Sequence, residues 1–263
     1  MKIFGYLDGD SFIHKLDPRT KIIGLFAVSG LLFVFNHPAY VFILFCFALL
    51  ISLTGGVLSR IFRLIIPLSI LAIVSMITWP FYLKGGTELF SIGGIVLSKE
   101  ALLYGIAMGF RWAGAIVLGI IFLSITRPDD FYAAMIKLKI PYSVAFVTSL
   151  TFRLVPSFIG SGVEIKEAQV SRGLDLNSGG IFSRVRKWMV LAVPLFMNAI
   201  QQTTRMTVAL ESRAFGSRTT RTFYRKYEMK RRDFAVLIIS SLMLLLCIFL
   251  RVNGFGVLLT DRL

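Results

Sequence analysis

Residues 22–53 read IIGLFAVSGLLFVFNHPAYVFILFCFALLISL, an apolar run that is interrupted only by Asn36, His37 and Pro38. A helix needs about 20 apolar residues to cross the hydrocarbon core of a bilayer, so the run is too long for one span. Asn-His-Pro favours a turn, because proline disfavours helical backbone in the residue before it. The stretch therefore predicts two short membrane spans joined by a tight turn, with His37 as a solvated loop residue rather than a ligand.

The composition of the whole chain also indicates a membrane protein. The 263 residues are 56% hydrophobic, include 24 phenylalanines and have a mean hydropathy of +0.77. A water-soluble core of this size does not hide so much apolar surface. Cys46 and Cys247 both lie in apolar runs, so we interpret them as packing residues rather than a disulfide or metal pair. The first 21 residues are polar and charged, and we expect the first span to act as its own insertion signal.

Three further apolar segments complete the predicted set of spans: Leu64 to Phe81, Ala101 to Ile125 and Phe234 to Leu250. Asp17 and Pro18 come before the first span and predict a helix N-cap and first turn. The glycine-rich segment from residue 84 to 99 suits an exterior loop or a hairpin. We therefore predict an all-α integral membrane protein with about five spans, its N-terminus in the cytoplasm and its C-terminus outside.

Residues 126–232 carry most of the positive charge. They hold 18 of the 29 Lys and Arg residues but 7 of the 14 Asp and Glu residues. Positive residues accumulate on the cytoplasmic side of membranes, so we expect this stretch in the cytoplasm. The predicted parts are residues 1–125 with four spans, residues 126–232, and residues 233–263 with the last span and a tail. Arg251 and Arg262 oppose the charge rule at the outer end.

The helices expected within the basic stretch are amphipathic. Apolar residues recur at helical spacing on each of the two long segments, while charged residues occupy the other faces. Such helices lie along a membrane or pack on each other below it. A competing interpretation makes residues 142–160 and 188–200 two additional spans. Arg153 and the pair Gln201-Gln202 interrupt those apolar runs and favour cytoplasmic helices.

Sequence motifs for catalysis are absent. The chain has no glycine-rich phosphate-binding loop of the Walker type, no His-x-x-x-His pair and no acid within the predicted spans. We therefore expect no catalytic residue, no metal site and no cofactor, and the interpretation is that this chain is not an enzyme. Arg111 lies about ten residues inside the fourth span, where a charge is costly and a functional candidate. We favour the simpler interpretation that it bonds to carbonyls of neighbouring helices.

Two arginines at expected helix ends are the remaining candidates. Ser171-Arg172-Gly173 follows Pro156 by about four helical turns, and Ser212-Arg213-Ala214 follows Pro194 by about five. Arginine carries a permanent charge on a planar fork that grips a carboxylate through two parallel hydrogen bonds. A small residue after it lets the chain turn away from the helix. The alternative is that both arginines only complement the negative ends of their helix dipoles.

Four stretches resemble one family, the transmembrane coupling or T component of energy-coupling factor transporters, the EcfT/CbiQ family. They are Leu16-Asp17-Pro18-Arg19-Thr20-Lys21, Phe152-Arg153-Leu154-Val155-Pro156, Ala168-Gln169-Val170-Ser171-Arg172-Gly173 and Glu211-Ser212-Arg213-Ala214. The stretches occur in the family's order between residue 16 and about residue 216. The family usually has Ala-Arg-Gly at both helix ends. Here serine replaces both alanines and Ala214 replaces the second glycine.

The resemblance implies a non-catalytic subunit of an ABC-type importer for vitamins or transition-metal ions, in a prokaryotic cell membrane. Arg172 and Arg213 would insert into grooves of two ATP-binding subunits, with Arg153, Pro156 and Glu211 in support. The same helices would hold a separate substrate-specific membrane subunit, and no nucleic acid is involved. Two other classes stay open. One is a basic membrane-anchoring or scaffold protein that binds anionic lipid, and the other is an integral-membrane enzyme or self-sufficient carrier.

Overall fold

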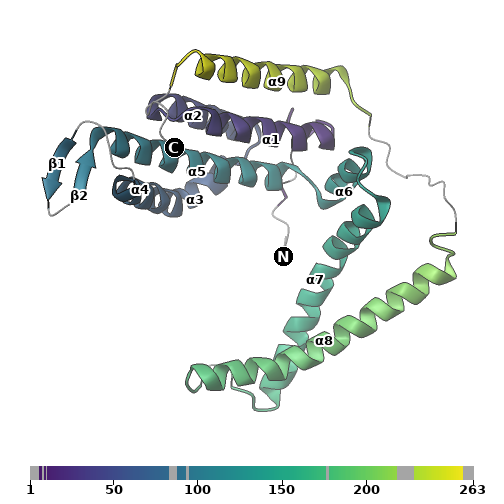
Figure 1. Cartoon of the computed structure of the whole chain (residues 1–263). Coiled ribbons are helices and arrows are strands. Elements are labelled where there is room, and N and C mark those ends of the chain that lie inside the picture. The colour runs from purple at the N-terminus through teal and green to yellow at the C-terminus, as the bar shows by residue number, and fades with distance from the viewer. Residues whose placement is uncertain are drawn as a thin grey trace. The chain divides into compact units, whose positions relative to one another are not determined.

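The computed structural model describes residues 6, 7, 9, 11–82, 88–92, 95–175, 178–217 and 228–256. Its described residues form helices and one short hairpin, as Figure 1 shows. The helices are α1 (Pro18–Val34), α2 (Pro38–Thr54), α3 (Leu58–Arg63), α4 (Ile65–Tyr82), α5 (Lys99–Ile125), α6 (Pro128–Lys137), α7 (Tyr142–Ser171), α8 (Ile181–Ser212) and α9 (Arg231–Val252). The prediction of an all-α membrane protein is confirmed. Between α4 and α5, β1 (Glu88–Ile92) pairs antiparallel with β2 (Ile95–Ser98), which confirms the expected hairpin.

The chain divides into two compact units. A membrane unit consists of residues 1–140 and 227–263, and a second unit consists of residues 141–226. The membrane unit holds the apolar core, which is built from α1, α2 and α5 with contributions from α3, α4 and α9. The second unit holds α7 and α8. The part boundaries predicted at residues 125 and 232 mark where the chain is expected to pass between membrane and cytoplasm. The division into compact units does not test this, so these boundaries stay predictions.

Three of the described helices are long and apolar enough to cross a membrane: α5, α7 and α9. α2 and α4 are shorter apolar helices, consistent with the short spans expected there. α7 belongs to the stretch that we assigned to the cytoplasm. It qualifies because Arg153 is the only charged residue between residues 142 and 163, so its first five turns are almost uniformly apolar. The five-span topology therefore stays a prediction.

The first two helices begin as expected. Asp17 is the N-cap of α1 and accepts a hydrogen bond from the backbone N–H of Arg19 at 2.9 Å, with proline in the first turn. His37 is the N-cap of α2, and its Nδ1 atom accepts from the backbone N–H of Ala39 at 3.2 Å. Free N–H groups at a helix start need such acceptors. The predicted turn between the two helices is confirmed, and its histidine acts as a cap.

One buried carboxylate ties the last helix of the membrane unit to the first. Asp233 is 2% exposed and lies in the first turn of α9. Its Oδ2 atom accepts from the backbone N–H of Lys230 at 2.8 Å, which completes the cap of its own helix. Its Oδ1 atom accepts from the backbone N–H of Asp17 at 2.7 Å, at the cap of α1. A single side chain therefore caps two helices that are more than 200 residues apart in sequence.

α4 and α5 approach so closely that their contact requires glycine. A Cβ atom at Gly105 would lie 3.1 Å from the Cα of Met76, and one at Gly109 would lie 3.0 Å from the Cα of Ala72. The two glycines are four residues apart and lie on one face of α5, the small-residue spacing that lets membrane helices pack backbone to backbone. Ser75 Oγ donates to the carbonyl of Gly105 at 3.1 Å and adds a hydrogen bond between the helices.

Replacing Gly109 with valine is expected to separate α4 from α5, because backbone atoms opposite the new side chain cannot rotate away. We expect a loss of about 1–3 kcal/mol in the free energy of unfolding, the usual effect of overpacking. Thermal unfolding of the purified protein in detergent measures it. Gly119→Val is the matched control, since a Cβ atom at Gly119 meets no atom within 4 Å. Equal melting temperatures for the two variants would contradict the close contact.

Candidate functional site

The second unit is an antiparallel hairpin of two long helices (Figure 1). Phe146, in the first turns of α7, packs against Phe215, which follows the end of α8, with ring centroids 4.5 Å apart. Near the middle of the hairpin, Gln202 Nε2 donates to Ser157 Oγ at 2.7 Å. At the other end, Val170 in the last turn of α7 lines the same recess as the first turns of α8.

This hairpin has almost no core of its own. Among the described residues of α7 and α8, Ala145 and Leu191 are the only buried ones. Two long helices that leave most of their apolar side chains exposed present surface for other molecules, whether lipid or protein. The candidate site is therefore an open pair of helices with exposed apolar surface rather than a closed pocket.

α7 ends in a Schellman motif built around the predicted glycine. Arg172 is the C-cap, and Gly173 follows it with a φ of +88°, in the left-handed region. The N–H of Gly173 donates to the carbonyl of Val170 at 2.9 Å, and the N–H of Leu174 donates to that of Gln169 at 3.0 Å. These two bonds satisfy carbonyls that the helix itself leaves free. The predicted cap is confirmed.

α8 ends in the same motif without a glycine. Arg213 is the C-cap, and Ala214 has a φ of +54°. The N–H of Ala214 donates to the carbonyl of Glu211 at 2.8 Å, and the N–H of Phe215 donates to that of Leu210 at 3.0 Å. A side chain in the left-handed region costs about 1–2 kcal/mol. The ring contact of Phe215 on α7 helps to hold the strained turn in place.

The two arginines lie at opposite ends of the hairpin. Both are exposed, and neither guanidinium forms a hydrogen bond or ion pair within the part of the chain that the structure describes. Arg213 is two residues from Phe215, which packs on Phe146, whereas Arg172 ends α7. The 26 steps along the helix from Phe146 to Arg172 span about 39 Å, so the two charges are roughly that far apart.

The serines that precede the arginines face their own helices. Ser171 Oγ donates to the carbonyl of Glu167 at 3.0 Å, and Ser212 Oγ donates to that of Ala209 at 3.0 Å. Each hydroxyl is thus occupied by the backbone one turn earlier. Toward a partner, these serines present little more than the small side chain that alanine has in the family's usual pattern.

Of the predicted supporting residues, Glu211 lies beside Arg213, whereas Arg153 and Pro156 lie away from both helix ends. Arg153 is exposed in the middle third of α7, and Pro156 lies inside the same helix one residue from Ser157. Proline removes one helical hydrogen bond and permits a bend, so Pro156 is placed to shape α7 where it meets α8. Glu211 is exposed, and its backbone carbonyl belongs to the cap of α8. The support given by all three stays a prediction.

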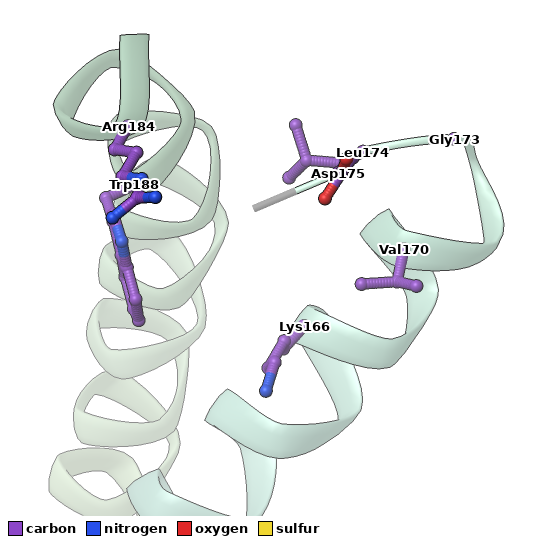
Figure 2. Close-up of a pocket in the computed structure, with 7 residues that line it drawn as sticks. All are labelled: Lys166, Val170, Gly173, Leu174, Asp175, Arg184 and Trp188. Atoms are coloured by element: carbon purple, nitrogen blue, oxygen red, sulfur yellow. The ribbon is translucent and has the colours of Figure 1, made fainter. Parts of the chain in front are cut away.

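A recess lies beside the end of α7. Figure 2 shows its lining side chains, which come from α7, from the turn after it and from the start of α8. They are Lys166, Val170, Gly173, Leu174, Asp175, Arg184 and Trp188. The recess has a volume of about 560 Å³ and adjoins Arg172 through Gly173. Charged groups and an exposed indole meet here, the mixture found at protein contact surfaces.

The sequence analysis missed a continuous apolar stripe on α8. Its members recur every three or four residues, and each is at least 46% exposed. They are Phe182, Val185, Met189, Val193, Phe196 and Ile200. The apolar pattern that we did identify on this segment was Ala192, Leu195, Phe196, Ala199, Met206 and Leu210, so it shares Phe196 with the stripe. That pattern lies partly against α7, as Leu195 beside Gly162 shows. Extending the period toward Phe182 would have found the second, unpartnered face.

Arg111 does not belong to the site. It is 4% exposed, and its Nε atom donates to the carbonyl of Leu32 at 3.0 Å. Its Nη2 atom donates to the carbonyl of Phe35 at 2.6 Å and to Asn36 Oδ1 at 3.2 Å. The guanidinium therefore satisfies free carbonyls at the end of α1, and the simpler interpretation is confirmed. Arg251 of α9 donates to carbonyls of the same helix end, which accounts for a cation on the predicted outer side.

The profile of the CbiQ family, described as cobalt transport protein, matches residues 9–224. The match covers α1 to α8 and both arginine ends. The chain therefore belongs to the CbiQ family, and it is a membrane-embedded member of the class of transmembrane transport components.

Similar proteins from three bacteria carry the name energy-coupling factor transporter transmembrane protein EcfT. The relative from Bacillus subtilis is 28% identical over 95% of this chain and 98% of its own length. The relative from Thermosediminibacter oceani is 30% identical over 90% of this chain and 93% of its own length. The relative from Staphylococcus aureus is 28% identical over 87% and 88%. The recognition of the EcfT/CbiQ family from four short stretches is confirmed.

Exchanging glycine and alanine at the two helix caps is expected to change the stability of the two helix ends in opposite directions. Gly173→Ala is expected to weaken the end of α7 by about 1 kcal/mol, and Ala214→Gly to strengthen the end of α8 by a similar amount. Hydrogen exchange measured by mass spectrometry reports both, as a change of about fivefold in amide exchange within the last helical turn. Gly160→Ala, in the middle of α7, is the control and is expected to slow exchange there. Faster amide hydrogen exchange at the end of α8 in Ala214→Gly than in the wild type would contradict the strained cap.

Proposed function

We propose that this chain is the coupling subunit of an energy-coupling factor importer. It transmits the ATP-driven motion of two ATPase subunits to a separate substrate-binding membrane subunit that takes up a vitamin or a transition-metal ion. The observation that carries this proposal is one hairpin with an exposed arginine at each of its opposite ends, neither of them paired with a residue that the structure describes. The names of the relatives and the absence of catalytic motifs in the sequence support it.

The helix-end arginines suit an interface that must stay bound while the subunits rotate relative to each other. A guanidinium on a helix end projects from the hairpin and offers two parallel donors to a carboxylate in a groove. Neither arginine has to leave a partner within the described chain before it binds. The recess beside Gly173 gives the α7 end additional contact area, with Trp188 as an aromatic anchor.

The separation of the arginines supports two ATPase partners. A single small groove is too short to bind both arginines, which are about 39 Å apart, whereas two grooves on two neighbouring subunits can bind one arginine each. The contacts along the hairpin, between Phe146 and Phe215 and between Ser157 and Gln202, make its two helices move together. A change in distance between the ATPases then acts on the whole hairpin.

The apolar stripe of α8 suits the substrate-binding subunit. A stripe with apolar residues on successive turns fits a groove of a membrane partner, and it lies on the same helix that ends in Arg213. The net positive charge of residues 126–232 favours the cytoplasmic side for the hairpin, next to ATP and to anionic lipid headgroups.

Replacing both Arg172 and Arg213 with alanine is expected to abolish association with the ATPase subunits. Hydrogen bonds to charged groups contribute about 1.5–3 kcal/mol each, so the loss of both contacts weakens binding at least about 100-fold. Co-purification of the three kinds of subunit, quantified by mass spectrometry, measures it. Membrane insertion and thermal stability of the variant should stay unchanged, because neither side chain has a partner within the described part of this chain.

Two matched controls distinguish specific binding by the helix-end arginines from an effect of the total positive charge. Ser171→Ala with Ser212→Ala keeps both arginines and should bind normally, since the hydroxyls serve their own helices. Arg186→Ala with Arg205→Ala removes the same charge from exposed positions of α8. Equal loss of binding in this pair and in the helix-end pair would favour a basic membrane scaffold instead.

A second experiment tests the stripe separately from the arginines. Val193→Glu with Phe196→Glu places two charges on exposed stripe positions and is expected to release the substrate-binding subunit while the ATPases stay bound. Gln201→Glu adds a charge to another face of the same helix and should release neither. If the stripe variant still binds the substrate-binding subunit, or if it loses only the ATPases, then the stripe is not the surface that binds the substrate-binding subunit.

A further inference from the structure

An apolar pocket lies within the membrane unit, far in sequence from the hairpin. It has a volume of about 220 Å³ and is lined by the segment before α1 and by α1, α2, α5 and α9. α1 and α9 contribute their first turns, whereas α2 and α5 contribute their last turns, so the pocket opens near one end of the helix bundle. Its walls are mostly aliphatic and aromatic, as in Ile13, Leu25, Val28, Leu118 and Phe122.

The polar groups of this pocket are few, and all but one are satisfied. Lys21 Nζ donates to the carbonyls of His14 at 2.9 Å and Ile125 at 3.0 Å. Ser240 Oγ donates to the carbonyl of Leu237 at 3.0 Å. Thr20 is the exception, because it is 1% exposed and its hydroxyl has no hydrogen-bond partner among the described residues.

Water does not suit this pocket. An ordered water needs two to four polar partners, and the lining offers one unpaired hydroxyl. Apolar cavities of about 150 Å³ that are lined by Leu, Ile and Phe stay dry and bind apolar molecules. In a membrane protein, the apolar molecules at hand are the acyl chains of the surrounding lipid.

We propose that this pocket binds one acyl chain of a membrane phospholipid. The Thr20 hydroxyl oxygen is itself closed off from the pocket, so the acyl chain is held by apolar contacts. The chain runs along α1 from Thr20 past Gly24 to Val28, about 12 Å of helix. Lys15 and Arg19 adjoin the lining residues in sequence and provide positive charge for the phosphate of the headgroup. This site is separate from the hairpin and does not depend on its function.

Gly24 is the position that tests the pocket directly. It belongs to the lining, and a Cβ atom built on it meets no atom within 4 Å. A phenylalanine there would fill the space of the acyl chain without displacing a neighbour. Gly119 is equally open but does not line the pocket, so Gly119→Phe adds the same side chain elsewhere in the membrane unit.

The experiment uses the full chain reconstituted into vesicles of phosphatidylcholine and phosphatidylglycerol with a photoreactive group on one acyl chain. After illumination, mass spectrometry of peptides locates and counts the labelled residues. We expect labelling near Gly24, Val28 and Leu118 in addition to the outward-facing Phe26 and Leu123. Gly24→Phe should lower labelling of the pocket residues at least about tenfold, the factor that corresponds to a loss of 1.4 kcal/mol. Gly119→Phe should leave it unchanged.

Two further variants keep the result decisive. Thr20→Val preserves the shape and removes a hydroxyl that is closed off from the pocket, so we expect it to leave the labelling of the pocket unchanged. Gly24→Ala is small enough to keep the acyl chain and shows whether the glycine matters for folding. Labelling confined to Phe26 and Leu123, or equal labelling in the wild type and in Gly24→Phe, would mean that only surrounding lipid is present and would overturn the proposal.

Discussion

Free backbone groups at the helix ends have to find partners inside the chain, and the structure of the membrane unit depends on how they do so. Within the apolar part of a bilayer, no water is available to take an unpaired N–H or carbonyl. At the start of α1, the carboxylate of Asp233 accepts from the cap residue Asp17. At its end, guanidinium groups from α5 and α9 donate to the last carbonyls. α1 is thus held at both ends by residues of helices that are distant in sequence.

Much of this fold could be predicted from sequence because its signals are local. Asp17 with Pro18 marks a helix start, and Asn36-His37-Pro38 marks a turn between two helices, through the backbone preferences of proline, and both predictions are confirmed. The capping role of His37 was not predicted. The role of Asp233 could not be predicted, since its second hydrogen bond crosses more than 200 residues. α7 was ambiguous for a different reason. Its first half is apolar enough for a span and its second half is charged, so composition alone assigns it to both sides of the boundary.

The candidate site shows the same limit. The arginines and their small neighbours could be found from spacing, and the cap of Gly173 follows from the conformational freedom of glycine. The antiparallel pairing of α7 and α8 could not, because it depends on contacts such as Phe146 with Phe215. Sequence reasoning therefore placed two charges on two helix ends but did not predict that the hairpin holds them at its far extremes. The unpartnered stripe of α8 was missed because the inward-facing apolar residues gave the stronger pattern.

The unequal caps of the two helices give the hairpin a built-in asymmetry. One arginine precedes a glycine that adopts the left-handed turn freely, whereas the other precedes an alanine that is held there by its surroundings. A strained turn relaxes when its supporting contact is lost, so the end of α8 is the less stable of the two helix ends. If the proposed ATPase subunits bind these two helix ends, two identical subunits meet ends of different stability. The order in which they bind and release then depends on the hairpin, without any difference between the two subunits.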